Sequence, residues 1–232
     1  HGVRHRRVRH PDAGAPHVSQ AEAGRITDEG IAHEVETYNA LIPEPNQLSA
    51  TLFTFGRVAA YGYLPYGMNR IDERIRRILR TDYGYRVGRT ASQEIKHTLG
   101  TAQPNAAPND VLMHMTGFSI ANRLPETFDV ETKPVLQACE DVVRELAALC
   151  ASVAEQAPEE LSADLNDAGA VLVGGGAELT GLDKRIGDAL GIPCRVADAP
   201  AACAIRGLHR IMESPEAYPA AFLDRRTSAQ WG

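Results

Sequence analysis

The spacing of apolar residues changes along this chain, and each regular stretch predicts one element of secondary structure. Ile71, Ile75, Ile78 and Leu79 recur at the spacing of one helix face, which predicts a helix over about 70–81. The same spacing predicts helices over about 27–41, 92–99, 132–157, 182–190 and 201–212. The helix over 132–157 has the clearest pattern: Pro134 lies in its first turn, where a missing N–H costs little, and Pro158 ends it.

Other stretches have the composition of strands. Residues 50–64 are rich in β-branched and aromatic residues around Gly56, which predicts a hairpin of two strands. Further strands are predicted over 111–115, 124–130, 170–173 and 193–196. Since strands alternate with helices in the second half of the chain, we expect an α/β fold with parallel pairing there.

Three consecutive glycines, Gly174, Gly175 and Gly176, join the apolar strand at 170–173 to the helix that follows. A turn without β-carbons lets the backbone approach a ligand, and its N–H groups favour polar or anionic groups. Such a turn is also common as a tight connection with no ligand. The glycines alone therefore leave both interpretations open.

Composition narrows the class of protein. Apolar residues make up 44% and charged residues 23%, which is ordinary globular usage. The net charge of −6 argues against a nucleic-acid binder, and no run approaches the roughly 20 apolar residues that span a bilayer. The first twenty residues hold four Arg and four His without an apolar period, so we expect a disordered tail over 1–24. That tail could be merely solvated, a basic arm, or a His-rich metal tract.

The four cysteines form no C-x-x-C pair, which favours small buried thiols in a reducing cytoplasm over a metal site. The charged residues of the helix at 70–81 form a further pattern. We expect Asp72 and Glu73 to pair with Arg76 and Arg77, four positions later on the helix surface.

Three ordered motifs resemble one known family. Residues 158–207 resemble the C-terminal signature of the MreB family of bacterial actins, with its P-P-E-L-A-x-D-I start, V-L-T-G-G-G-A-L-L-x-G-L-D turn, T-G-I-P-V-x-V-A strand and E-D-P-L-T-C-V-A-x-G close. Residues 94–102 resemble its E-R-I-K-x-E-I-G-S-A helix end, and residues 67–73 its G-G-D-K-F-D-E hinge. The order and spacing match, so the resemblance covers about 67–212.

The resemblance implies an actin-like ATPase fold, ribonuclease H-like, with a small inserted α+β subdomain. Residues 25–66 and 131–212 would form the family's subdomain IIA, with its core at 40–66 and 131–212. Residues 67–130 would form the inserted subdomain IIB, and residues 213–232 a C-terminal tail.

The resemblance also implies a site for ATP, with Mg²⁺ if the full site exists. In the family, the glycine turn faces the adenosine and α-phosphate, which points to Gly174, Gly175 and Gly176 with Ala177 beside them. The family's E-x-x-K helix holds the ribose and adenine from the other side. Here its lysine is Lys96, and Gln93 replaces its glutamate.

The resemblance is incomplete for hydrolysis. The family's second phosphate loop, D-x-G-G-G-T-T, would fall near 42–48, where this chain reads I-P-E-P-N-Q-L. The hinge is also altered, with Met68 in the place of its second glycine. We therefore expect no ATP hydrolysis. The chain is either a fragment whose first forty or so residues are misread or foreign, or a degenerate bacterial actin that keeps a scaffold and polymer contacts.

The function that the resemblance implies is that of a cytoplasmic cell-shape cytoskeleton. It implies nucleotide-linked self-association into filaments and partners among wall-synthesis or morphogenesis proteins. We expect membrane contact only through segments of the family's N-terminal half. The alternatives are a nucleotide-free scaffold module and an ATP-dependent chaperone or sugar kinase of the same superfamily.

Overall fold

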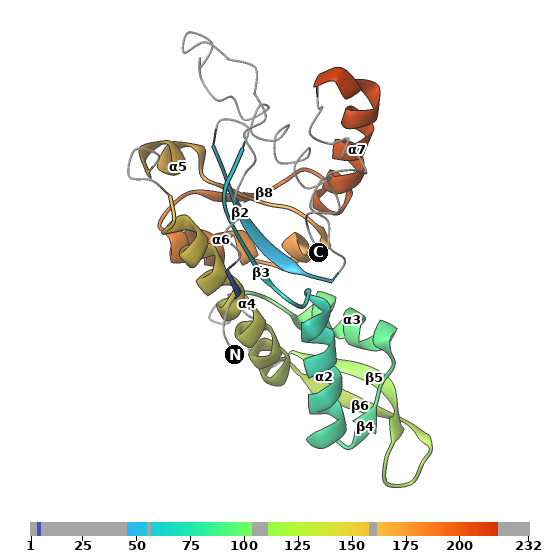
Figure 1. The fold of residues 1–232 in the computed structure, drawn as a ribbon. Helices are drawn as coiled ribbons and strands as arrows, with labels where there is room; N and C mark the ends of the chain where they lie inside the picture. The colour runs from blue at the N-terminus through green and yellow to red at the C-terminus, as the bar shows by residue number, and fades with distance from the viewer. Residues whose placement is uncertain (1–3, 6–45, 55–56, 104–110, 158–161, 218–232) are drawn as a thin grey trace.

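The computed structural model describes residues 4–5, 46–54, 57–103, 111–157 and 162–217. The helix predicted over 27–41, nearly all of the predicted N-terminal tail and residues 218–232 lie outside these ranges. The fold is mixed α/β and is divided into a larger and a smaller lobe (Figure 1).

An antiparallel hairpin opens the larger lobe, as the sequence predicted. Strand β2 (Leu48–Thr54) pairs with β3 (Arg57–Leu64), and Leu48 lies opposite Leu64. The register shifts between Leu52 and Phe53, where the pattern is that of a β-bulge. The short β1 (Arg4–His5) pairs with the other side of β3.

The smaller lobe follows the hairpin directly. It contains α2 (Asn69–Thr81), β4 (Tyr85–Arg86), α3 (Arg89–Leu99), β5 (Leu112–Ser119) and β6 (Pro125–Glu131). The three strands form an antiparallel sheet in the order β4-β5-β6. Helix α3 begins three residues before its predicted start, because its first turn is polar and carries no apolar signal.

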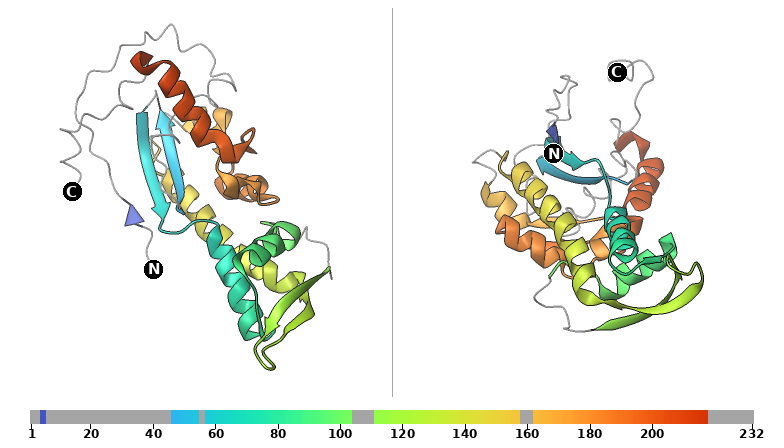
Figure 2. Two further views of the ribbon diagram at one scale, coloured as in Figure 1. Left: turned by 90° about the vertical axis from the view of Figure 1, so that its right-hand side faces the viewer. Right: turned by 90° about the horizontal axis from the view of Figure 1, so that it is seen from below.

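The long helix α4 (Thr132–Ala154) connects the lobes (Figures 1 and 2). Its apolar residues serve two separate cores. Val135, Cys139 and Val142 pack with Ile71 and other residues of α2, α3 and the smaller sheet. The next residue, Val143, packs instead in the larger lobe, together with four further buried residues of α4, namely Leu146, Ala147, Leu149 and Val153.

The rest of the larger lobe alternates helices and strands. In chain order it contains α5 (Ser162–Ala168), β7 (Ala170–Leu172), η3 (Gly175–Glu178), α6 (Leu182–Leu190), β8 (Cys194–Val196), η4 (Pro200–Ala202), α7 (Cys203–Glu213) and η5 (Pro215–Ala217). Strands β7 and β8 pair in parallel, as predicted. Figure 1 shows the strands of this lobe between α4 and α6 on one side and α7 on the other.

Two features of the fold bear on the sequence interpretation. The four cysteines are free thiols, and burial raises the pKa of the Cys139 thiol to about 11, which keeps it protonated. None of the described helices is both long and apolar enough to cross a membrane. The exact boundaries of the two subdomains stay a prediction.

Candidate functional site

The glycine turn follows β7 and begins with a backbone conformation that favours glycine. Gly174 has φ +85° and ψ 161°, which L side chains rarely adopt. Its N–H donates to the carbonyl of Pro200 at 2.8 Å, which ties the turn to η4. The carbonyl of Gly174 accepts from the N–H of Ala177 at 3.0 Å, and Ala177 is buried beneath the turn.

The next glycine is open to solvent. A β-carbon built on Gly175 would meet no atom closer than Ala201 Cβ, at 3.9 Å. Within the described residues, the N–H groups of Gly175 and Gly176 have no hydrogen-bond acceptor. The backbone here is therefore accessible and has two donors to offer a polar ligand.

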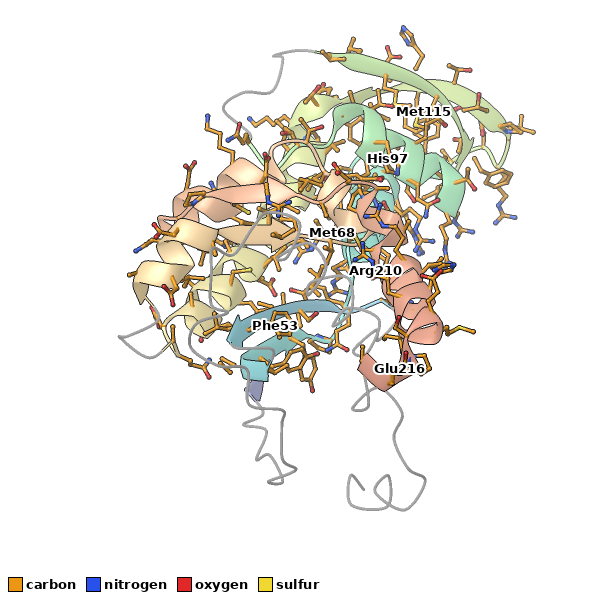
Figure 3. The ribbon with its side chains drawn as sticks, turned by 90° about the horizontal axis from the view of Figure 1, so that it is seen from above. Phe53, Met68, His97, Met115, Arg210 and Glu216 are labelled. Atoms are coloured by element: carbon orange, nitrogen blue, oxygen red, sulfur yellow. The ribbon has the colours of Figure 1, made fainter. Side chains whose placement is uncertain are left out.

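The third glycine is covered by a side chain from the hinge. A β-carbon on Gly176 would lie 2.5 Å from Cγ of Met68, the residue just before α2. Met68 is half-buried and packs against both hydrophobic cores, and Figure 3 shows it at the junction of the two lobes. Met68, which replaces the second glycine of the family's hinge motif, thus reaches the glycine turn with its side chain.

The end of α3 lies beside the glycine turn. After α3, the N–H of Ala102 and the hydroxyl of Thr101 both donate to the carbonyl of Thr180, at 2.9 and 3.0 Å. Gly181 has φ +72°, and a β-carbon there would come within 2.9 Å of Cγ of Gln103. These contacts join the residues after α3 to Thr180 and Gly181, which follow the glycine turn and η3.

Lys96 points at an acidic residue of α2. Its ammonium lies 2.9 Å from Oδ1 of Asp72 and donates to Oδ2 at 3.1 Å. The side chains are 14% and 5% exposed, so this is a largely buried ion pair. Because an ammonium has three N–H donors, Asp72 leaves Lys96 with donor capacity.

The expected surface pairs on α2 are wrong. Asp72 lies on the buried side of the helix, where it meets Lys96 and not Arg76. The carboxylate of Glu73 pairs with Arg70 at 3.2 Å and not with Arg77. Helix spacing places Arg76 within reach of Asp72, but the packing of α3 against α2 brings Lys96 to Asp72 instead.

Gln93 is exposed on α3, one turn before Lys96. No contact of its side chain is seen within the described residues. Its amide can both donate and accept, so it is free to meet a ligand. The roles of Gln93 and Lys96 in nucleotide binding stay predictions.

A polar strip beside the hinge was not apparent from the sequence. The hydroxyl of Tyr66 donates to the carboxylate of Glu145 on α4, and burial together with this bond raises the Tyr66 pKa. The guanidinium of Arg70 lies 5.7 Å from the centre of the Tyr66 ring, within cation–π range. Arg74 pairs with Asp141 of α4. These partners are distant in the chain, so spacing could not reveal them.

The described residues contain no group of three or more His, Cys, Asp or Glu side chains arranged to hold a metal. A Mg²⁺ at this site would thus need oxygens from its ligand or from residues outside the described ranges. The site as described consists of backbone donors, one engaged lysine and a covering methionine.

Comparison with known protein families gives one match over most of the chain. The family model described as MreB/Mbl protein matches residues 50–219, which includes the hairpin, both lobes and α7. The match begins at residue 50, whereas the motif resemblance began only at the hinge, at residue 67.

Curated relatives agree with this match. The cell shape-determining protein MreB of Escherichia coli K12 is 32% identical over 147 residues, covering 63% of this chain and 42% of the relative. The cell shape-determining protein Mbl of Bacillus subtilis 168 is 27% identical over 168 residues, covering 72% of this chain and 50% of the relative. The chain thus spans about half the length, or less, of the curated relatives it matches.

Solved structures show a similar fold at low sequence identity. MreB5 of Spiroplasma citri bound to AMPPNP aligns with a TM-score of 0.69 and 19% identity, over 83% of this chain and 61% of that one. The MamK double helical filament aligns with a TM-score of 0.62 and 18% identity, over 78% of this chain and 57% of that one. These likenesses concern the fold alone.

Proposed function

This chain belongs to the MreB/Mbl family of actin-like proteins, and on that premise we propose that it is a cytoskeletal protein that takes part in determining cell shape. The observation that carries the proposal is the family match over 50–219, which spans both lobes. The curated relatives are cell shape-determining proteins, and MamK forms a filament.

The proposed activity is head-to-tail self-association in the cytoplasm. Contacts between different faces of successive copies leave a free face at each end, so they generate open polymers. Proteins of wall synthesis or morphogenesis are the proposed partners of such a polymer.

The proposed ligand is ATP, bound against Gly174, Gly175, Gly176 and Ala177. Two features favour this ligand: the open space at Gly175 and the two N–H donors of the turn. AMPPNP and ADP are bound in structures of MreB5. Met68 argues against tight binding of ATP, because its side chain covers the third glycine. The residues present therefore fit a ligand at the start of the turn better than at its end.

Lys96 and Gln93 would face the same ligand from the end of α3. The ammonium of Lys96 keeps donor capacity beyond its pair with Asp72, and the exposed amide of Gln93 can donate or accept. Both groups suit the hydroxyls of a ribose or the edge of a base. We propose binding without hydrolysis, because the segment that would hold the family's second phosphate loop reads I-P-E-P-N-Q-L over 42–48.

A second candidate is a scaffold of the same fold that binds no nucleotide. The specific observation in its favour is again Met68, which fills space that the family leaves open with a glycine. The family match itself favours both of these over a chaperone or a sugar kinase.

Sedimentation and equilibrium dialysis of the purified chain test the proposal. Filament formation predicts pelleting above a critical concentration, at a threshold that shifts when ATP is added. Binding at the turn predicts a dissociation constant below about 1 mM, roughly −4 kcal/mol, for labelled ATP. Gly175→Val should weaken that binding because it fills the open approach, whereas Gly88→Val adds the same side chain at another open glycine and should not.

The outcomes separate the candidates. Polymers without measurable nucleotide binding would support the scaffold. A chain that stays monomeric at every concentration, with or without ATP, would overturn the cytoskeletal proposal.

A further inference from the structure

A surface pocket lies on the smaller lobe, at the C-terminal half of α2. It is lined by Glu73, Arg76, Arg77, Arg80, Arg86 and Val87 and encloses about 480 Å³. We call it the arginine pocket. Four of its six side chains carry a fixed positive charge, in a chain whose net charge is −6.

The sequence places these side chains together by helix spacing and one turn. Residues 73, 76, 77 and 80 are separated by three and four positions, so they share one face of α2. After α2, the chain reverses at Gly84, which has φ +76°, and enters β4. Strand β4 packs against α2 and adds Arg86 to the same face.

Among the residues that the structure describes, no carboxylate lies within ion-pair distance of the four arginines. Within the described ranges, Arg76, Arg77, Arg80 and Arg86 form no salt bridge, and the carboxylate of Glu73 is engaged by Arg70 at 3.2 Å. The Nε of Arg76 is buried and has no hydrogen-bond partner.

Other arginines of the chain do find partners. Arg74 of α2 pairs with Asp141 of α4, and Arg185 of α6 pairs with Glu140 at 2.6 Å. Within the described residues, Arg89, Arg123 and Arg195 also form no salt bridge, so the pocket is distinguished by gathering four such arginines around one depression.

Such an arrangement favours the approach of an anion, although Arg77, Arg80 and Arg86 are exposed and their mutual repulsion is small. Like charges three and four positions apart on a helix repel one another. The negative end of the helix dipole offsets this repulsion for Arg80, which lies in the last turn, but not for Arg76 or Arg86. Several guanidinium groups around one pocket can form paired hydrogen bonds to the oxygens of a phosphate.

We propose that the arginine pocket binds a phosphomonoester or diphosphate group. The chemistry is shared by a free phosphate compound and by the headgroup of an anionic lipid. The site differs from the proposed ATP site at the glycine turn, because Arg80 lies twelve residues, about 18 Å of helix, beyond Met68. The inference does not rest on the proposed function.

Isothermal calorimetry with inorganic diphosphate at low salt tests this site. Diphosphate carries no nucleoside, so the experiment is independent of ribose or base recognition at the glycine turn. The expected result is a dissociation constant that weakens at least tenfold in Arg77→Gln/Arg80→Gln and weakens on addition of NaCl. Arg144→Gln changes an exposed arginine of α4 outside the pocket. It removes one positive charge, as Arg77→Gln alone does, and should leave the constant unchanged.

Thermal unfolding provides a second measurement. The Arg77→Gln/Arg80→Gln variant should fold and unfold at the same temperature as the wild type or higher, because a repulsion is removed. Diphosphate should raise the unfolding temperature of the wild type and of Arg144→Gln, but not that of the double variant. If the double variant does not fold, Arg77→Gln alone serves in both measurements.

Vesicles of phosphatidylcholine with phosphatidic acid distinguish the two sources. Co-sedimentation that requires Arg77 and Arg80 would identify a lipid headgroup, and diphosphate binding without vesicle binding would identify a free phosphate compound. Binding of neither probe, or equal loss of binding in Arg144→Gln and the double variant, would overturn the proposal.

Discussion

The side chain of Met68 lies over Gly176, with Cγ 2.5 Å from the position that a β-carbon on Gly176 would take. This contact joins the hinge before α2 to the glycine turn after β7. It makes the small size of residue 176 a packing requirement.

We expect Gly176→Ala to destabilise the chain by about 1–3 kcal/mol, the usual cost of overpacking. The added methyl group would displace Met68, which is held by both cores. Gly175→Ala is the matched control, because the nearest atom to its β-carbon is 3.9 Å away, and it should change stability far less. Urea unfolding measures both. Equal effects of the two substitutions would contradict the contact.

We expect Met68→Gly to tighten the binding of labelled ATP, by about fivefold or roughly 1 kcal/mol if Met68 obstructs the turn. The substitution removes the covering side chain, and glycine suits the position before a helix. Equilibrium dialysis compares the variant with the wild type. An unchanged or weaker affinity in a folded variant would mean that Met68 does not limit access.

We expect Lys96→Met to destabilise the chain by about 3 kcal/mol, because it leaves the buried carboxylate of Asp72 without its cation. The matched control is Arg70→Met, which breaks the half-exposed pair with Glu73 and should cost less than about 1 kcal/mol. Urea unfolding at neutral pH measures both. Adding Asp72→Asn to Lys96→Met should recover part of the loss, and no recovery would argue against the pair.

We expect stability to fall as the pH rises from 9 to 11, partly through Cys139. Burial raises the pKa of this thiol from 9.0 to about 11, so the folded state holds a proton that the unfolded state releases. The contribution is fully present below pH 9 and is lost toward pH 11, with a slope of about 1.4 kcal/mol per pH unit for one thiol.

The free energy of unfolding of Cys139→Ala, measured at the same series of pH values, isolates this contribution. Lysines and tyrosines titrate in both proteins and cancel in the comparison. The variant should show a shallower decline between pH 9 and 11, and identical slopes would show that the thiol does not take part.

The sequence predicted those elements whose signal is local. The period of Ile71, Ile75 and Leu79 predicted α2 to within one residue, and the parallel pairing of β7 and β8 followed from the alternation of strands and helices. Helix α5 was missed because its sequence, S-A-D-L-N-D-A, carries too few apolar residues to show a period.

The contacts of the candidate site depend on which elements pack together, and spacing alone does not determine this. Asp72 can reach Arg76 on its own helix, yet α3 brings Lys96 to it and buries the pair. The substitution at Met68 was visible in the sequence, but its position over Gly176 was not. Motif resemblance, and not periodicity, singled out Gly174, Gly175 and the end of α3 as a site, and their joint role stays a prediction.

Helix α4 places Val142 in one core and Val143 in the other. Consecutive residues of a rigid helix cannot move independently, so loosening of the smaller lobe withdraws packing from the larger one. Partial opening of either lobe therefore carries part of the free-energy cost of opening both. Amide hydrogens near the middle of α4 should accordingly be among the slowest to exchange with solvent, and a single denaturation transition should include the whole described chain.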